Sequence, residues 1–222
     1  MPQRTEEFIN GGLRIIQDDR FFKLGTDSLL LSGFPSIKKG LRVCDLGCGC
    51  GSLCALLAAR HAGISVTGVE IQPEAADVAR EMVSLNGLGD RVNIINGDIN
   101  HIGALLPAGS FDLVVCNPPY RAPGSGARAR REAAETARGE GACGLDGICA
   151  VAAYLLRFGG KICLSHRPDR LGDVVCALRG NGLEPKRLHL YGACGADVPS
   201  IMLAEGKKGA GAGVIIKNFT LE

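Results

Sequence analysis

The sequence predicts an α/β fold built on a doubly wound, mostly parallel sheet, and three observations lead to that prediction. From residue 40 onward, strand signals and helix signals alternate, which is typical of consecutive βαβ units. A glycine-rich turn, "DLGCGCG", joins the first of these strands to its helix. Residues 185–222 then carry three strand signals with little room for helices between them, which indicates antiparallel pairing at one edge of the sheet.

The elements follow in chain order. In residues 1–39, "LRIIQDDRFFKLGTDSLLLSGF" predicts a short hairpin and then a helix that starts near Thr26, with Thr26 or Asp27 as its cap. Strands are then expected at residues 41–47, 64–70, 91–97, 111–117, 161–166, 185–192, 200–208 and 211–222. Helices are expected at residues 52–62, 72–87, 147–160 and 168–182, where proline near a first turn or glycine past an end marks the limits.

Composition bounds the class of protein. The 222 residues are 46% hydrophobic, which is typical of a globular chain, and we expect one domain over residues 1–222, with 1–39 as an extension and 40–222 as the core. No apolar run approaches the roughly 18 residues that span a bilayer, and "MPQRTEEFIN" lacks the apolar centre of a signal peptide. We therefore expect a cytoplasmic protein without a membrane partner. The formal charge of +2 does not by itself indicate nucleic acid.

The ten cysteines are expected to be free thiols in a reducing compartment. Four of them fall within residues 44–54, but no Cys-x-x-Cys pair is present, and four ligands along one strand–turn–helix passage could hardly surround a tetrahedral ion. We therefore expect no metal. The histidines show no metal spacing either, and His166 is the one expected nearest to a site, because it follows a strand.

Polar and glycine residues gather where successive strands end. The turn after the first core strand has an acid, Asp45, followed by glycine at every second position: Gly47, Gly49 and Gly51. Glycine permits a sharp turn and close approach of a ligand, and the helix that follows offers N–H donors. Glu70 and Asp98 end the next two strands, and Glu70 can accept both hydroxyls of a ribose. A nicotinamide-binding turn would have G-x-G-x-x-G spacing instead.

The segment "VVCNPPY" ends the fourth strand of the core. Pro118 and Pro119 fix two φ angles and remove two donors, so the strand stops in a stiff tip that carries the Asn117 amide and the Tyr120 ring. The Asn117 oxygen and the Pro118 carbonyl suit an exocyclic amine, because two acceptors would localise its lone pair and stabilise the positive charge that develops when the amine acts as a nucleophile. Tyr120 can stack on an extruded base.

These motifs resemble those of a known superfamily. The glycine turn is similar to the first motif of class I S-adenosylmethionine-dependent methyltransferases, which have a Rossmann-like fold, and "NPPY" is similar to the motif of amino-methyltransferases acting on adenine N6, guanine N2 or a glutamine amide. From about Leu13 to the C-terminus the chain resembles the YfiC-like valine-tRNA adenine-N6 methyltransferases. That resemblance includes "ARGE" at residues 137–140, "HRPDRL" at 166–171 and "EGKKG" at 205–209, with Gly139 where the family usually has histidine.

The resemblance implies S-adenosylmethionine as cofactor, S-adenosylhomocysteine as product, and RNA as substrate, specifically an adenine near the anticodon of valine tRNA. The implied cofactor-binding residues are Asp45, Gly47, Gly49, Gly51, Glu70, Ile71, Asp98, Ile99, Asn117 and Thr26. The implied catalytic residues are Asn117, Pro118, Pro119 and Tyr120. Residues 121–142 are expected to form a flexible substrate loop, with these arginines as candidates for RNA phosphates: Arg121, Arg128, Arg130, Arg131 and Arg138.

Three alternatives stay open. Larger guanine-N2 methyltransferases of ribosomal RNA carry a duplicated domain that is absent here. Protein-glutamine methyltransferases carry a helical domain before the first motif, whereas 44 residues precede Asp45. A non-enzymatic cofactor-binding partner tends to lose the catalytic motif, which this chain retains. The sequence leaves open the RNA species, the methylated position, the effect of Gly139, which loop arginines contact phosphate, and the choice between monomer and homodimer.

Overall fold

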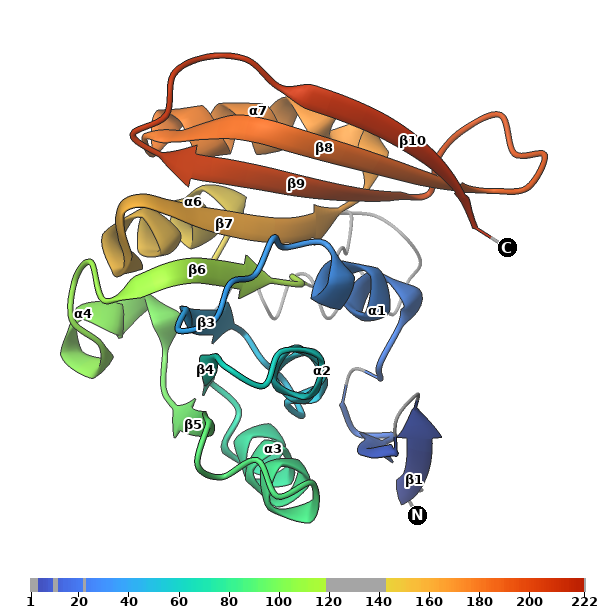
Figure 1. Cartoon of the computed structure of the whole chain (residues 1–222), viewed down its shortest axis with the longest axis vertical. Coiled ribbons are helices and arrows are strands. Elements are labelled where there is room, and N and C mark those ends of the chain that lie inside the picture. The colour runs from blue at the N-terminus through green and yellow to red at the C-terminus, as the bar shows by residue number, and fades with distance from the viewer. Residues whose placement is uncertain (1–3, 10–11, 22, 119–142, 222) are drawn as a thin grey trace, which may run out of the picture.

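The computed structural model describes residues 4–9, 12–21, 23–118 and 143–221, and its main body is an eight-stranded sheet with helices on both faces (Figure 1). The strands of this sheet are β3 (Arg42–Leu46), β4 (Ser65–Glu70), β5 (Val92–Asn96), β6 (Phe111–Cys116), β7 (Leu156–His166), β8 (Leu183–Ala193), β9 (Ile201–Lys208) and β10 (Ile215–Leu221). The helices are α1 (Thr26–Gly33), α2 (Ser52–Arg60), α3 (Pro73–Leu85), α4 (Ile102–Leu105), α6 (Leu145–Leu155) and α7 (Leu171–Gly180). Two 3-10 turns are η1 (Ile99–His101) and η2 (Pro168–Arg170).

The predicted α/β class and mostly parallel sheet are confirmed. The strand order is β10-β8-β9-β7-β6-β3-β4-β5, and the pairs from β7 through β6, β3 and β4 to β5 are all parallel. Strand β9 runs antiparallel to both β7 and β8, as expected for the C-terminal strands. The antiparallel prediction is wrong for β10, which pairs in parallel with β8. Strand β9 ends beside the start of β8, and residues 209–214 cross over that end of β8. Strand β10 therefore pairs with the edge of β8 opposite β9 and runs in the same direction as β8.

Side chains alternate across the sheet and build two separate cores. On β6, Leu113 and Val115 belong to the core under α1, α2 and α3, whereas Val114 and Cys116 belong to the core under α6 and α7. This period of two is the geometry of an extended strand covered on both faces. It explains why the apolar runs of the strands are nearly continuous, and it leaves the strand ends as the place where polar side chains gather.

The N-terminal hairpin is confirmed and packs against this body. Strands β1 (Arg4–Ile9) and β2 (Leu13–Asp18) pair antiparallel, and Ile15 and Ile16 of β2 are buried in the core with α2 and α3. The Asn86 side chain, just past α3, fixes the hairpin: its oxygen accepts from Arg14 N at 2.8 Å and its nitrogen donates to Arg14 O at 2.8 Å. Among the described residues, no helix has the length and apolarity needed to cross a membrane.

Three local predictions need correction. The helix expected at residues 147–160 ends at Leu155, because Leu156 pairs with Phe111 and the chain continues as β7. The N-cap position of α1 is Gly25, so no side chain caps the helix, and Thr26 is the first helical residue rather than the cap. The sequence reasoning also placed no helix between β5 and β6, where η1 and the single turn of α4 lie.

Candidate active site

The glycine turn after β3 is held by the neighbouring strand β4. Gly47 N and Cys48 N donate to the Val69 carbonyl oxygen at 2.9 and 3.1 Å. All three predicted glycines have positive φ, 70° at Gly47, 54° at Gly49 and 82° at Gly51, a backbone region that other residues rarely adopt. A Cβ at Gly47 or Gly49 would point into open space, whereas a Cβ at Gly51 would lie 2.9 Å from the Cβ of Ala79 on α3. The first two glycines therefore leave room for a ligand, and the third lets the turn pack on α3.

Glu70 ties the end of β4 to this turn. Its side chain is 7% exposed; Oε2 accepts from Gly49 N at 2.8 Å and Oε1 accepts from Gln72 N at 2.9 Å. A carboxylate offers about four lone-pair sites, so each oxygen keeps capacity for a further donor such as a ribose hydroxyl. Ile71 follows with 45% of its side chain exposed, beside the Asn96 amide, which donates to both the Glu70 and Ile71 carbonyl oxygens.

Asp45 lies beneath the turn and is 1% exposed. The Cys54 thiol of α2 donates to its Oδ2 at 3.3 Å. Burial raises the pKa of Asp45 to about 7, the Cys54 hydrogen bond lowers that pKa, and the negative charge of Glu70 raises it. A cation bound above the turn would favour the ionised form of this carboxyl.

Asp98 lies after β5 and caps η1. Its Oδ1 accepts from Asn100 N at 2.8 Å and from Asn100 Nδ2 at 2.9 Å, and its Oδ2 is 3.6 Å from His101 Nδ1. Ile99 opens η1 and packs, half-buried, on the core under α6. The carboxyl is therefore oriented by its own turn, at the strand end next to that of Glu70.

Asn117 leaves the sheet directly after β6, as predicted, and its amide is held from two sides. Its Nδ2 donates to Ser28 Oγ at 2.8 Å, and its Oδ1 accepts from the hydroxyl of Ser165. Ser28 lies on α1 and is 8% exposed; Ser165 lies near the end of β7 and is fully buried. Sequence reasoning missed both serines. The one available signal was a serine at the border of an apolar run, before the leucines of "TDSLLL" and near the end of "KICLSH".

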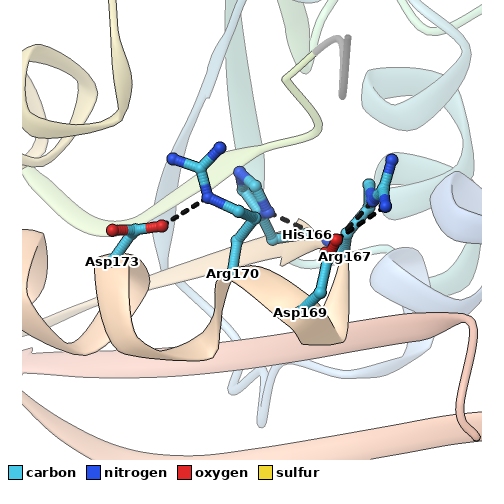
Figure 2. A network of polar contacts seen from close by, with 5 residues as sticks. All are labelled: His166, Arg167, Asp169, Arg170 and Asp173. Atoms are coloured by element: carbon cyan, nitrogen blue, oxygen red, sulfur yellow. Dashed lines mark hydrogen bonds and ion pairs between the residues drawn. The ribbon is translucent and has the colours of Figure 1, made fainter. Parts of the chain in front are cut away.

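The end of β7, η2 and the first turn of α7 carry a polar cluster of five residues (Figure 2). His166 Nδ1 accepts from Arg167 N at 2.9 Å, Arg167 forms a two-bond pair with Asp169, and Arg170 pairs with Asp173. Burial lowers the pKa of His166. These arginines are committed to carboxylates of their own segment, and the cluster shapes the turn into α7 beside the strand end that carries Ser165.

The predicted residues are therefore partly assembled. The structure brings the glycine turn, Asp45, Glu70, Asp98 and Asn117 to the carboxyl edge of neighbouring strands. Thr26 is exposed at the start of α1, two residues before Ser28, and Pro118 is half-buried after Asn117. Pro119, Tyr120 and the five loop arginines lie outside the described residues.

The last features of this region are the metal-ligating side chains and Lys208 of the "EGKKG" segment. In the part of the chain that the structure describes, no three metal-ligating side chains converge, and the ten cysteines are free thiols. Lys208 donates to the carbonyl oxygens of Ala153 and Leu156 at 2.6 and 2.8 Å, where it closes the end of α6.

Comparison with known proteins adds a family and a set of relatives. A family model described as a methyltransferase domain matches residues 37–168. A tRNA1(Val) (adenine(37)-N6)-methyltransferase of Yersinia pestis is 34% identical over 167 residues, which are 75% of this chain and 66% of that protein. The protein of the same name from Yersinia pseudotuberculosis matches equally. The matched part thus spans just under two-thirds of the length of these curated relatives.

Solved structures share the fold. A predicted O-methyltransferase from Agrobacterium tumefaciens superposes with a TM-score of 0.71 at 23% identity, covering 88% of this chain and 87% of that one. The cyclase SpnF superposes with a TM-score of 0.60 at 14% identity, covering 83% and 80%. Since a cyclase shares this architecture, the fold by itself does not define the reaction.

Proposed function

Because the chain belongs to the methyltransferase-domain family, we propose that it transfers a methyl group from S-adenosylmethionine to N6 of an adenine in RNA, specifically an adenine near the anticodon of valine tRNA. One observation carries the proposal. Strands β3 and β6 pair in parallel with Asp45 opposite Val115, so Gly47 and Asn117 leave the sheet on adjacent strands. Neighbouring strands lie about 4.8 Å apart, so a cofactor bound at the glycine turn would lie beside the Asn117 amide.

The residues around the turn fit this cofactor. Gly47 and Gly49 leave open space where side chains would otherwise stand, and Glu70 is a buried carboxylate with lone-pair capacity for ribose hydroxyls. The positively charged amino acid end of the cofactor would favour the ionised form of Asp45 and would interact with it. Asp98, which follows the neighbouring strand β5, would contact the adenine. When bound, S-adenosylmethionine supplies an electrophilic methyl group on a sulfonium.

The chemistry that the chain's own residues contribute is orientation and charge stabilisation. The exocyclic amine of adenine is a poor nucleophile because its lone pair is delocalised into the ring. The Asn117 oxygen and the Pro118 carbonyl would accept its two hydrogens and localise that lone pair on nitrogen. As the amine accepts the methyl group, positive charge would develop on its nitrogen, and both acceptors would stabilise that charge. The surplus proton leaves to solvent after transfer.

Substrate capture is assigned to residues that follow the motif. Tyr120 would stack on the extruded base, and the arginines of residues 121–142 would contact phosphates. The names of the relatives support tRNA as the substrate class.

In the deciding experiment, the purified protein and labelled S-adenosylmethionine are incubated in three separate reactions. The reactions contain total tRNA, ribosomal RNA and total protein, respectively. N6-methyladenosine in the tRNA digest is expected; label in guanine or in glutamine would contradict the proposal. Asn117→Ala should lower kcat about a hundred- to a thousandfold with a smaller change in KM, since the oxygen acts mainly in the transition state. Asn93→Ala, at an exposed position on β5, is the matched control and should leave kcat unchanged.

A further inference from the structure

We propose that Ser28 and Ser165 are positioning residues that hold the Asn117 amide with its oxygen available to the substrate amine; this deepens, and rests on, the function proposed above. Asn117 Nδ2 donates to Ser28 Oγ at 2.8 Å, and the Ser165 hydroxyl donates to Asn117 Oδ1. The two serines lie on α1 and β7, so the amide is hydrogen-bonded by elements that are far apart in the chain.

The orientation of this amide decides whether the site can work. A half-turn about the terminal torsion of asparagine exchanges its oxygen and its nitrogen. With nitrogen toward the substrate, two donors would face each other and the amine would lose an acceptor. Ser28 keeps the nitrogen turned toward α1. Ser165 bonds to the oxygen through one lone pair, and a carbonyl oxygen has two, so the same oxygen can also accept from the amine.

Both hydroxyls are buried and bond to the amide of Asn117. Ser165 is fully buried and Ser28 is 8% exposed, and a buried hydroxyl is costly unless it is hydrogen-bonded. Ser32, also fully buried on α1, meets that need within its own helix by donating to the Leu29 carbonyl at 2.7 Å. Ser28 and Ser165 instead both bond to Asn117, at separations of 89 and 48 residues.

Kinetics of four variants test the proposal with the full chain and tRNA. Ser28→Ala and Ser165→Ala should each lower kcat about tenfold, roughly the effect of one lost hydrogen bond, while the Kd for S-adenosylmethionine and the KM for RNA stay near wild type. Ser28→Thr retains a hydroxyl and should restore kcat. Ser32→Ala is the matched control and should keep wild-type kcat. In an Asn117→Ala background, the serine substitutions should cause no further loss.

A second measurement needs no substrate and separates this proposal from the assigned reaction. The side-chain NH2 signals of Asn117, identified by their absence in Asn117→Ala, should shift and exchange faster with solvent in Ser28→Ala and Ser165→Ala but not in Ser32→Ala. If the wild type methylates no RNA but these changes occur, the proposed reaction is contradicted, whereas the positioning of the Asn117 amide by the two serines is supported. If the signals are unchanged, or if the active enzyme keeps its kcat in both serine variants, the positioning role is overturned.

Discussion

Replacing Asp45 with asparagine is expected to make the stability of the cofactor-free protein less sensitive to pH and to weaken cofactor binding. Asp45 is 1% exposed, and burial raises its pKa to about 7, against an ordinary value of 3.8. The folded state therefore holds the proton more tightly than the unfolded state. The resulting stability is fully present below pH 4 and is lost as the pH rises through 7.

The size of the effect follows from that difference in pKa. At about 1.4 kcal/mol per unit, the interval from 3.8 to about 7 corresponds to roughly 4 kcal/mol of unfolding free energy that the wild type loses between pH 4 and pH 8. An asparagine side chain does not titrate, so the stability of Asp45→Asn relative to wild type should rise by that amount over the same interval. The slope with pH is the diagnostic quantity, because the amide itself changes the hydrogen bonding at every pH.

Urea unfolding at several pH values between 4 and 8, without cofactor, measures this slope. Asp112→Asn is a control of opposite sign, and for this variant and the wild type the series is extended below pH 4. Burial raises the pKa of Asp112, but hydrogen bonds from Arg42 N and the Arg157 guanidinium prevail and lower it, so its contribution is present above pH 4 and lost in acid. Parallel stability profiles of wild type and Asp45→Asn would refute the reasoning, because Asp45 would then be ionised throughout the range.

Three further predictions concern the cofactor, the turn and the RNA. Glu70→Ala should weaken binding of S-adenosylmethionine and S-adenosylhomocysteine in calorimetry, and equal affinities would remove Glu70 from the ribose. Gly51→Ala should cost about 2–4 kcal/mol of unfolding free energy, because its φ is 82° and its Cβ would lie 2.9 Å from a side chain of α3. Gly47→Ala faces open space, so it should cost about 1–2 kcal/mol and affect cofactor affinity more; equal losses of stability would contradict this contrast. Arg130→Ala combined with Arg131→Ala should reduce the slope of log RNA affinity against log salt concentration by about one for each phosphate that is no longer bound, without changing cofactor affinity. An unchanged slope would indicate that these arginines belong to a solvated surface.

Local patterns in the sequence were sufficient for much of the fold and for part of the site. The alternation of strand and helix signals predicted the parallel sheet. These signals are local, because an apolar run or a capping glycine influences the conformation of residues next to it in the chain. The positions of the glycine turn, Glu70 and Asn117 at strand ends followed for the same reason. The end of α6 was misjudged because Leu156 is drawn into pairing with Phe111 of β6, a partner that its own neighbourhood does not reveal.

The sequence by itself thus determined which residues end the strands and which chemistry they suit. The tertiary structure alone decided that β10 runs parallel to β8, that burial raises the pKa of Asp45, and that serines of α1 and β7 meet at the Asn117 amide. The physical reason is the same in each case. Strand direction, burial and a hydrogen bond across 89 residues depend on how distant segments pack, and packing is a property of the assembled chain rather than of any local stretch.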